Sequence, residues 1–194
     1  MRRRILLSSG GTRRGTIGDY EVVDLSLPSG LLFATCNVGA NAETDYGNYY
    51  MYGKGSREYT YGDSIYEGTE NPLASTADTA TQVMGSGWRM PTQTELQELI
   101  NNTNYEWVTN FNGSGVNGGK FTSKTNPNAY VFFPAAGYYN NGSLYDKGSV
   151  GCVWSSTPGG SSLAYGLYFL SGSKGVDNRY RYCGFSVRGV HAAV

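Results

Sequence analysis

The sequence predicts an α+β fold, in which antiparallel sheets carry two helices within a single domain. Three observations point to this class. A strand pair comes first, at residues 20–36, two helical segments follow, at 77–84 and 92–102, and only short strands come after residue 110. Because helices and strands are segregated along the chain, an antiparallel sheet is favoured over a doubly wound parallel one. The domain is expected to span residues 20–194.

The strand pair is expected to form a hairpin. Residues 20–27 alternate between polar and apolar types, and the segment Pro28-Ser-Gly30 ends them. Residues 31–36 then read as a second strand that turns back on the first. Residues 46–66 are rich in tyrosine and glycine and sustain neither a helical nor a strand period, so they predict an ordered, irregular loop.

The helix after Pro91 carries the clearest local signal. Thr92 and Glu95 have the spacing of a capping box, and Leu96, Leu99 and Ile100 give the helix one apolar face. We expect this helix to end near residue 102. A shorter helix is predicted over 77–84, with Asp78 in its first turn and Gly85 as its stop.

Short aromatic and β-branched runs predict a meander in the second half. The expected strands cover residues 121–123, 129–133, 150–155, 164–170 and 180–187, and the turn clusters 140–142 and 171–175 separate some of them. In the run 164–170 a period of two places Tyr165, Leu167 and Phe169 on the core face. Gly166, Tyr168 and Leu170 are then expected on the opposite face.

The charge is unevenly distributed although the formal net charge is zero. Residues 1–14 carry five arginines and no acid, whereas residues 15–146 carry fourteen acids and five bases. We interpret residues 1–19 as a basic arm rather than a nucleic-acid-binding tail, because it has no interleaved aromatic residues. Its apolar run is too short for a classical signal peptide. No stretch is long enough for a membrane span.

The three cysteines, Cys36, Cys152 and Cys183, lack the spacing of a zinc or redox motif. Cys152 and Cys183 could form a disulfide if they lie on neighbouring strands, although buried free thiols are the favoured interpretation. The sequence leaves that pairing open.

Enzymatic interpretations lack the residues they need. His191 is the single histidine, and no nucleophile-elbow motif accompanies it, so neither a metal site nor a catalytic triad is expected. The glycine pattern at 113–118 does not open a helix, so no dinucleotide cofactor is expected. Asp45, Asp63 and Glu67 are interpreted as solvated loop acids, and a structural calcium stays open. The chain is therefore predicted to need no cofactor.

A family resemblance rests on motifs spread along the chain. They are GWRMPTQTEL at 87–96, VDLSLPSGLLFATCNVG at 23–39, FPAAG at 133–137, WSST at 154–157 and SVR at 186–188. Together these segments resemble the branch of the C-type lectin fold that includes formylglycine-generating enzymes and the paralogous surface domains of Fibrobacter and Bacteroides. The closest likeness is to the variable proteins of diversity-generating retroelements. The resemblance implies a C-type lectin-like domain over residues 20–194.

In those variable proteins the C-terminal region is mutagenised at adenines and forms a hypervariable ligand-binding surface, as on the receptor-binding tips of phages. The resemblance therefore implies a non-enzymatic receptor-binding protein with a variable region at about 153–187. Positions whose residue types fit adenine mutagenesis are the expected ligand-binding residues: Leu163, Gly166, Tyr168, Leu170, Ser173, Asp177, Asn178, Arg179, Tyr180, Tyr182, Cys183 and Phe185. Arg181 is assigned to the scaffold, because the family pattern usually keeps an arginine there.

The expected partner is a protein or carbohydrate receptor on a target cell, which implies host adhesion from a phage tail or display at a cell surface. The oligomeric state stays open, with a homo-trimer as one expectation from related display proteins. An alternative is a carbohydrate-binding or adhesion domain of fixed specificity on the same fold. Enzyme activity is not expected, because the catalytic cysteine pair or metal site of the enzyme branch has no counterpart here.

Overall fold

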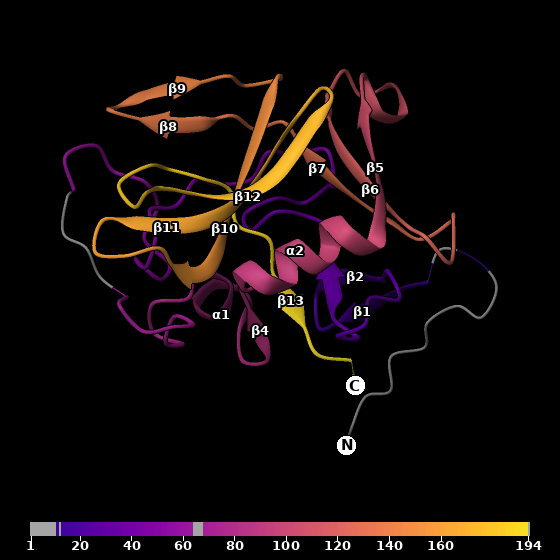
Figure 1. Cartoon of the computed structure of the whole chain (residues 1–194), viewed down its shortest axis with the longest axis horizontal. Helices are drawn as coiled ribbons and strands as arrows, with labels where there is room; N and C mark the ends of the chain where they lie inside the picture. The colour runs from indigo at the N-terminus through magenta and orange to yellow at the C-terminus, as the bar shows by residue number, and fades with distance from the viewer. Residues whose placement is uncertain (1–10, 12, 64–67, 194) are drawn as a thin grey trace.

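The computed structural model describes residues 11, 13–63 and 68–193. Over these residues the chain forms one domain of mostly antiparallel sheets with two α-helices, which confirms the predicted α+β class. Figure 1 shows the sheet that holds both ends of the domain at the bottom of the view, with helix α2 above it and the remaining sheets higher. Among the described residues, no helix has the length and apolar composition needed to cross a bilayer.

The first sheet joins the two ends of the domain. Its order is β1 (Arg14–Ile17), β2 (Tyr20–Asp24), β3 (Leu32–Ala34), β13 (Val190–His191) and β4 (Trp88–Arg89). Strands β2 and β3 pair antiparallel, which confirms the predicted hairpin. Because β13 pairs with both β3 and β4, the end of the domain is held between elements from its first half.

Strand β1 corrects the expectation of an arm over residues 1–19. Arg13 forms an ion pair with Asp24, and Arg14 pairs with Glu21 and Glu43 at 3.1 and 3.0 Å. These two arginines therefore form ion pairs with acidic residues of the segment that follows, and residues 14–17 form an edge strand of the sheet. The rest of the predicted arm, residues 1–10 and 12, lies outside the described part of the chain.

Both predicted helices are present. Helix α2 (Gln93–Asn102) has Thr92 as its N-cap and the complete capping box with Glu95. Helix α1 (Thr79–Met84) begins two residues later than predicted, because Asp78 is the N-cap and accepts a hydrogen bond from the Thr81 amide. Gly85 follows α1 as its C-cap, as predicted.

The remaining strands form three antiparallel sheets. One contains β5 (Thr103–Val108), β6 (Gly118–Ser123) and β7 (Tyr130–Pro134), with the 3-10 turn η1 (Phe111–Gly113) between β5 and β6. A two-stranded sheet pairs β8 (Tyr138–Asn140) with β9 (Ser143–Tyr145). The third contains β10 (Val150–Pro158), β11 (Leu163–Leu170) and β12 (Ser173–Tyr180). Strands β5, β8 and β9 are not among those predicted from the sequence.

The strand predicted over residues 180–187 is wrong. The chain turns at Ser171 and Gly172 and forms β12 over Ser173–Tyr180, where polar residues hid the strand signal. Residues 181–187 are mostly buried because they cross the interior, where they form isolated bridges to Tyr50, Tyr139 and Val153 instead of a ladder. The irregular loop is confirmed for residues 46–63, where Tyr50 takes part only in isolated bridges.

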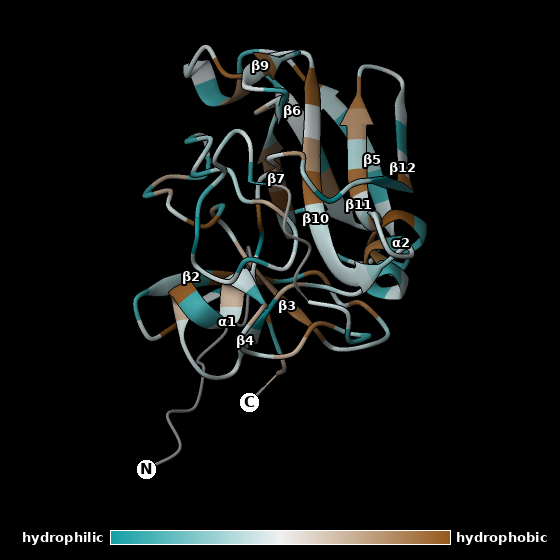
Figure 2. Cartoon of the chain, turned by 90° about the vertical axis from the view of Figure 1, so that its left-hand side faces the viewer, coloured by the Kyte–Doolittle hydropathy of each residue, from teal (hydrophilic) through white to brown (hydrophobic). Residues whose placement is uncertain are grey.

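The interior contains two main apolar clusters. The first lies under α2 and includes Leu96, Leu99, Phe121 and Phe169. The second includes Tyr52, Cys152, Trp154 and Phe185, and it lies on the other side of the β10–β12 sheet. Figure 2 shows apolar and polar residues following one another along β10 and β11, as strands packed on a core require.

Candidate ligand-binding surface

The register of β11 decides which predicted site residues share a face. Tyr168 pairs with Cys152 on β10 and with Gly175 on β12, while its neighbour Leu167 pairs with Val153. Directly paired residues point to the same side of a sheet, so Tyr168, Cys152 and Gly175 share one face and Leu167 lies on the other. The predicted alternation along β11 is therefore confirmed.

Neither face of β11 is entirely free. Leu167 and Phe169 pack into the cluster under α2, as predicted. On the opposite face, Ala164 and Trp154 are buried in the second cluster, and Tyr168 packs against them. The surface expected on this face is therefore limited to its end, where Tyr168 and the neighbouring part of β12 reach solvent.

The structure divides the twelve predicted ligand-binding residues into three groups by exposure. The exposed ones are Ser173, Asp177 and Tyr180, the half-buried ones are Leu163, Tyr168, Leu170, Asn178, Arg179 and Tyr182, and the buried ones are Gly166, Cys183 and Phe185. The register also places Leu163, Asn178 and Tyr180 on the α2 side of the sheet, apart from Tyr168.

Three of the predicted contact residues belong to the interior, which corrects the prediction. Phe185 is 2% exposed and stacks on Trp154 with the ring centroids 4.1 Å apart. Cys183 is 5% exposed in the same cluster, and burial raises its pKa to about 11. Gly166 lies against the backbone of Val153, where an added Cβ would be 2.7 Å from the Val153 carbonyl oxygen. The prediction was based on residue types that fit adenine mutagenesis, and these types do not indicate whether a side chain is buried.

Tyr168, Asp177 and Arg179 form a polar and aromatic group. The Arg179 guanidinium donates to Asp177 Oδ2 at 2.6 Å and lies 5.6 Å from the centre of the Tyr168 ring. This hydrogen bond holds the pKa of the Asp177 carboxyl below its usual value. Tyr168 lies over Gly175, where an added Cβ would come within 2.7 Å of the ring. Glycine at 175 therefore makes room for the tyrosine.

Tyr180 and Tyr182 follow this group along the chain, and Tyr180, as the partner of Leu163, lies at the end of β12 on the α2 side of the sheet. Their rings stack with centroids 5.1 Å apart and an interplanar angle of 12°. Tyr180 is 53% exposed, which is unusual for so large an aromatic side chain. We call Tyr168, Asp177, Arg179, Tyr180 and Tyr182 the tail surface.

Arg181 belongs to the scaffold, as predicted. Its buried guanidinium donates to the carbonyl oxygens of Leu163, Gly160 and Gly68, at 3.0, 2.7 and 3.3 Å. These bonds tie the chain between Tyr180 and Tyr182 to two other loops. The tail surface is consequently mounted on a fixed backbone.

A second group of tyrosines, which was not predicted as a site, lies outside the predicted variable region at about 153–187. Tyr59 stacks on Tyr139 of β8 at 4.9 Å, and Tyr59 Oη accepts a hydrogen bond from the Gly142 amide at 2.9 Å. Tyr61 is 69% exposed. The tyrosine density of residues 46–66 was the available signal, but only the folded chain brings this loop against the β8–β9 turn.

This group and the tail surface meet in a small cavity. Tyr59, Tyr61 and Asp63 from the irregular loop, Asn141 from the β8–β9 turn, and Tyr182 from the tail line a volume of about 210 Å³. We call it the tyrosine cavity. It joins residues from three parts of the chain that lie far apart in sequence.

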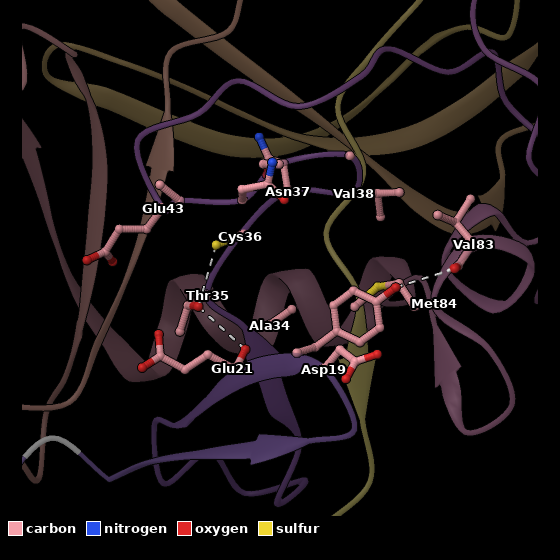
Figure 3. Close-up of a pocket in the computed structure, with 15 residues that line it drawn as sticks. Asp19, Glu21, Ala34, Thr35, Cys36, Asn37, Val38, Glu43, Val83 and Met84 are labelled. Atoms are coloured by element: carbon pink, nitrogen blue, oxygen red, sulfur yellow. Dashed lines mark hydrogen bonds between the residues drawn. The ribbon is translucent and has the colours of Figure 1, made fainter.

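A larger cavity of about 530 Å³ lies elsewhere, between the β2–β3 hairpin and the end of α1. Figure 3 shows Glu21, Glu43 and Cys36 around it. Tyr20, which also lines it, donates a hydrogen bond from its hydroxyl to the Val83 carbonyl oxygen at 3.4 Å. None of the predicted ligand-binding residues lines it. Glu21 and Glu43 are both paired with Arg14, so they act in holding β1.

The acidic side chains and the single histidine serve structural roles. Within the described ranges, no three His, Cys, Asp or Glu side chains converge as a metal would require. Asp63 pairs with Lys54 at 2.9 Å, and Asp45 accepts from the backbone amides of residues 41 and 42, so these acids take part in loop structure. Glu67 lies outside the described residues. His191 ends β13 with its ring against Trp88, as a strand-end residue.

Comparison with known proteins adds a family match over part of the chain. No curated protein and no solved structure matches it. Residues 115–190, which run from just before β6 to β13, are similar to a family described as a domain of unknown function (DUF8237).

Proposed function

We propose that this protein is a non-enzymatic receptor-binding protein that displays a diversified surface on a C-type lectin-like fold. The observation that carries the proposal is the tail surface itself, in which one exposed tyrosine, two half-buried tyrosines, an arginine and an aspartate lie beside a chain segment fixed by buried Arg181. Tyrosine offers a large and rigid contact area, and small polar residues adapt their hydrogen bonds, so antibody loops favour the same set.

The motifs behind the proposed family occupy scaffold positions, which supports the fold assignment. Trp88 and Trp154 are core residues, and Thr92 caps α2. The last residue of the WSST motif, Thr157, accepts a hydrogen bond from the Gln93 amide at 2.9 Å, which joins this motif to the GWRMPT motif. These motifs therefore encode packing and capping, and they leave the tail surface free to vary.

Arg188 of the SVR motif is a further support. Its guanidinium is fully buried and donates to Asn37 Oδ1 and to the carbonyl oxygens of Ala34 and Phe132, each at 3.0 Å. The Arg188 side chain thus joins the segment that follows the predicted variable region to β3, to the loop after β3 and to β7. Replacing Arg188 should destabilise the fold, because several buried carbonyl groups would lose their hydrogen-bond donor.

The proposed partner is a protein receptor on a target cell, bound from a phage tail or from a cell surface. The alternative is a carbohydrate-binding domain of fixed specificity. The two proposals predict different DNA sequences around the gene. We expect the flanking DNA to hold a near-identical copy of the tail's coding sequence, together with a reverse-transcriptase gene. Sequencing this locus in several isolates should show differences confined to template adenines. Identical tails in all isolates, with no template copy, would contradict diversification.

A further inference from the structure

We propose that the tyrosine cavity binds a cationic side chain, namely an arginine of a protein ligand. Tyr59 and Tyr61 come from the irregular loop, and Tyr182 comes from the tail surface. The inference rests on the proposed receptor-binding function and names the chemistry of one contact. It also places part of the contact on residues outside the tail.

The size of the cavity favours a single side chain. Sites for drug-sized ligands usually enclose about 300–1,000 Å³. The tyrosine cavity has about 210 Å³, which accommodates the head of one long side chain but not an oligosaccharide. A protein ligand can place one projecting residue here while the tail surface contacts its surroundings.

The charges around the cavity favour a cation. Asp63 is the one charged residue among the described residues that line it. Its partner Lys54 is buried, with a side chain 2% exposed, whereas the Asp63 side chain is 26% exposed. A ligand would therefore meet the carboxylate rather than the ammonium group. Aromatic ring faces are negative and attract cations, and three tyrosines line the cavity beside Asp63.

Two of the three rings are held in place by stacking before any ligand arrives. Tyr59 stacks on Tyr139 at 4.9 Å, and Tyr182 stacks on Tyr180 at 5.1 Å. Tyr61 packs on Gly142, where an added Cβ would lie 3.2 Å from the ring. Rings that are already ordered lose little conformational entropy on binding. Flat rings also favour arginine over lysine, because the planar guanidinium stacks on aromatic faces.

The experiment is an NMR titration of the complete chain with three small probes. The probes are Nα-acetyl-arginine methylamide, its citrulline analogue, which has nearly the same shape without the charge, and a methyl hexoside. We expect the arginine probe to shift the amide signals of residues 59–63 and 141–142 saturably, with a Kd on the order of 1 mM. The citrulline probe and the hexoside should leave these signals unchanged.

Two variants at one exposed position test the role of the ring. Tyr61→Leu should weaken arginine binding roughly two- to fivefold, the loss expected for an exposed cation–π contact. Tyr61→Phe keeps the ring and should bind like the original chain. Tyr145→Leu is the matched control, because Tyr145 is also exposed but does not line the cavity. If Tyr61→Leu failed to fold, the comparison of arginine with citrulline in the original chain would still decide.

The outcomes separate this inference from the proposed function. Equal binding of arginine and citrulline would overturn the cation site, and shifts caused by the hexoside alone would make the cavity a sugar site. In either case receptor binding through Tyr168 and Tyr180 would be unaffected. Conversely, selective arginine binding combined with invariant tails at the locus would support the cavity and contradict the proposed diversification.

Discussion

Cys152 and Cys183 show how burial sets the chemistry of single residues beneath the tail surface. Both thiols lie in the second core cluster, and burial raises their pKa values to about 12 and about 11. Both are free, and so is Cys36, which is half-buried. The disulfide that the sequence left open is therefore not formed in this structure, and the buried thiols should be inert toward alkylation.

Thiol labelling tests this account of the three cysteines. At about pH 8, iodoacetamide should modify Cys36 and leave Cys152 and Cys183 unmodified until the chain is unfolded in urea, because only thiolates react quickly. Mass spectrometry of labelled peptides gives the sites. Cys36→Ser should abolish the native-state label. Rapid modification of Cys183 in the folded protein would instead mean that the tail opens readily.

The same shifts predict how stability depends on pH. A thiol whose pKa is raised on folding stabilises the folded state at a pH below its unfolded pKa, and that stabilisation is lost as the pH rises through the folded value. The contribution of these thiols to the free energy of unfolding should therefore fall between about pH 9 and pH 12.

At the scale of elements, helix α2 was predictable because its signals are local. Thr92 Oγ1 accepts a hydrogen bond from the Glu95 amide at 3.2 Å, and Glu95 Oε2 accepts one from the Thr92 amide at 2.8 Å. The Glu95 carboxylate also pairs with Arg89 through two bonds of 2.7 and 2.6 Å. Burial raises the pKa of Glu95, but the hydrogen bonds from Arg89 and Thr92 outweigh burial and lower it overall.

Replacing this carboxylate should destabilise the protein in a pH-dependent way. Glu95→Gln should lower the free energy of unfolding by about 1 kcal/mol at neutral pH, because it loses the charged pair with the half-exposed Arg89. A lowered pKa stabilises the fold above the unfolded value of about 4.5, and this contribution is lost as the pH falls through the folded value. Urea titrations should therefore show the difference shrinking as the pH falls below about 4.5.

A matched control is available on β5. Glu106 is exposed and is also a glutamate, so Glu106→Gln should leave the urea midpoint nearly unchanged. A loss for Glu95→Gln that persisted at acid pH would show that packing, rather than charge, explains the effect.

Other elements could not be predicted, because their signals depend on tertiary contacts. Residues 181–187 have strand-like composition, yet they pass through the interior with Val187 fully buried and form single bridges. Strands β8 and β9 are only three residues long each, so their alternation is too short to recognise. The sequence predicted the turn at 140–142 but not the strands on either side of it.

At the scale of the whole molecule, buried residues that join distant segments are distinct from the partly exposed tail surface. The residues that join distant segments are buried: Arg188 ties the tail to β3 and β7, and Arg181 fixes the chain between two tail tyrosines. The family pattern assigned Arg181 to the scaffold, and its burial agrees with that assignment. Sequence motifs could not show that Cys183 and Phe185 belong to the scaffold, or that Tyr59 and Tyr61 approach Tyr182, because those relations exist only in the folded chain.

The most direct test of this separation compares two randomised libraries of the same tail. One varies Asp177, Arg179, Tyr180 and Ser173, which reach solvent, and the other varies Gly166, Arg181, Cys183 and Phe185, which are buried. The measurement is the fraction of displayed variants that resist protease. We predict that most members of the first library stay folded and that few members of the second do. Similar losses in both libraries would contradict the claim that the scaffold holds an independently variable surface.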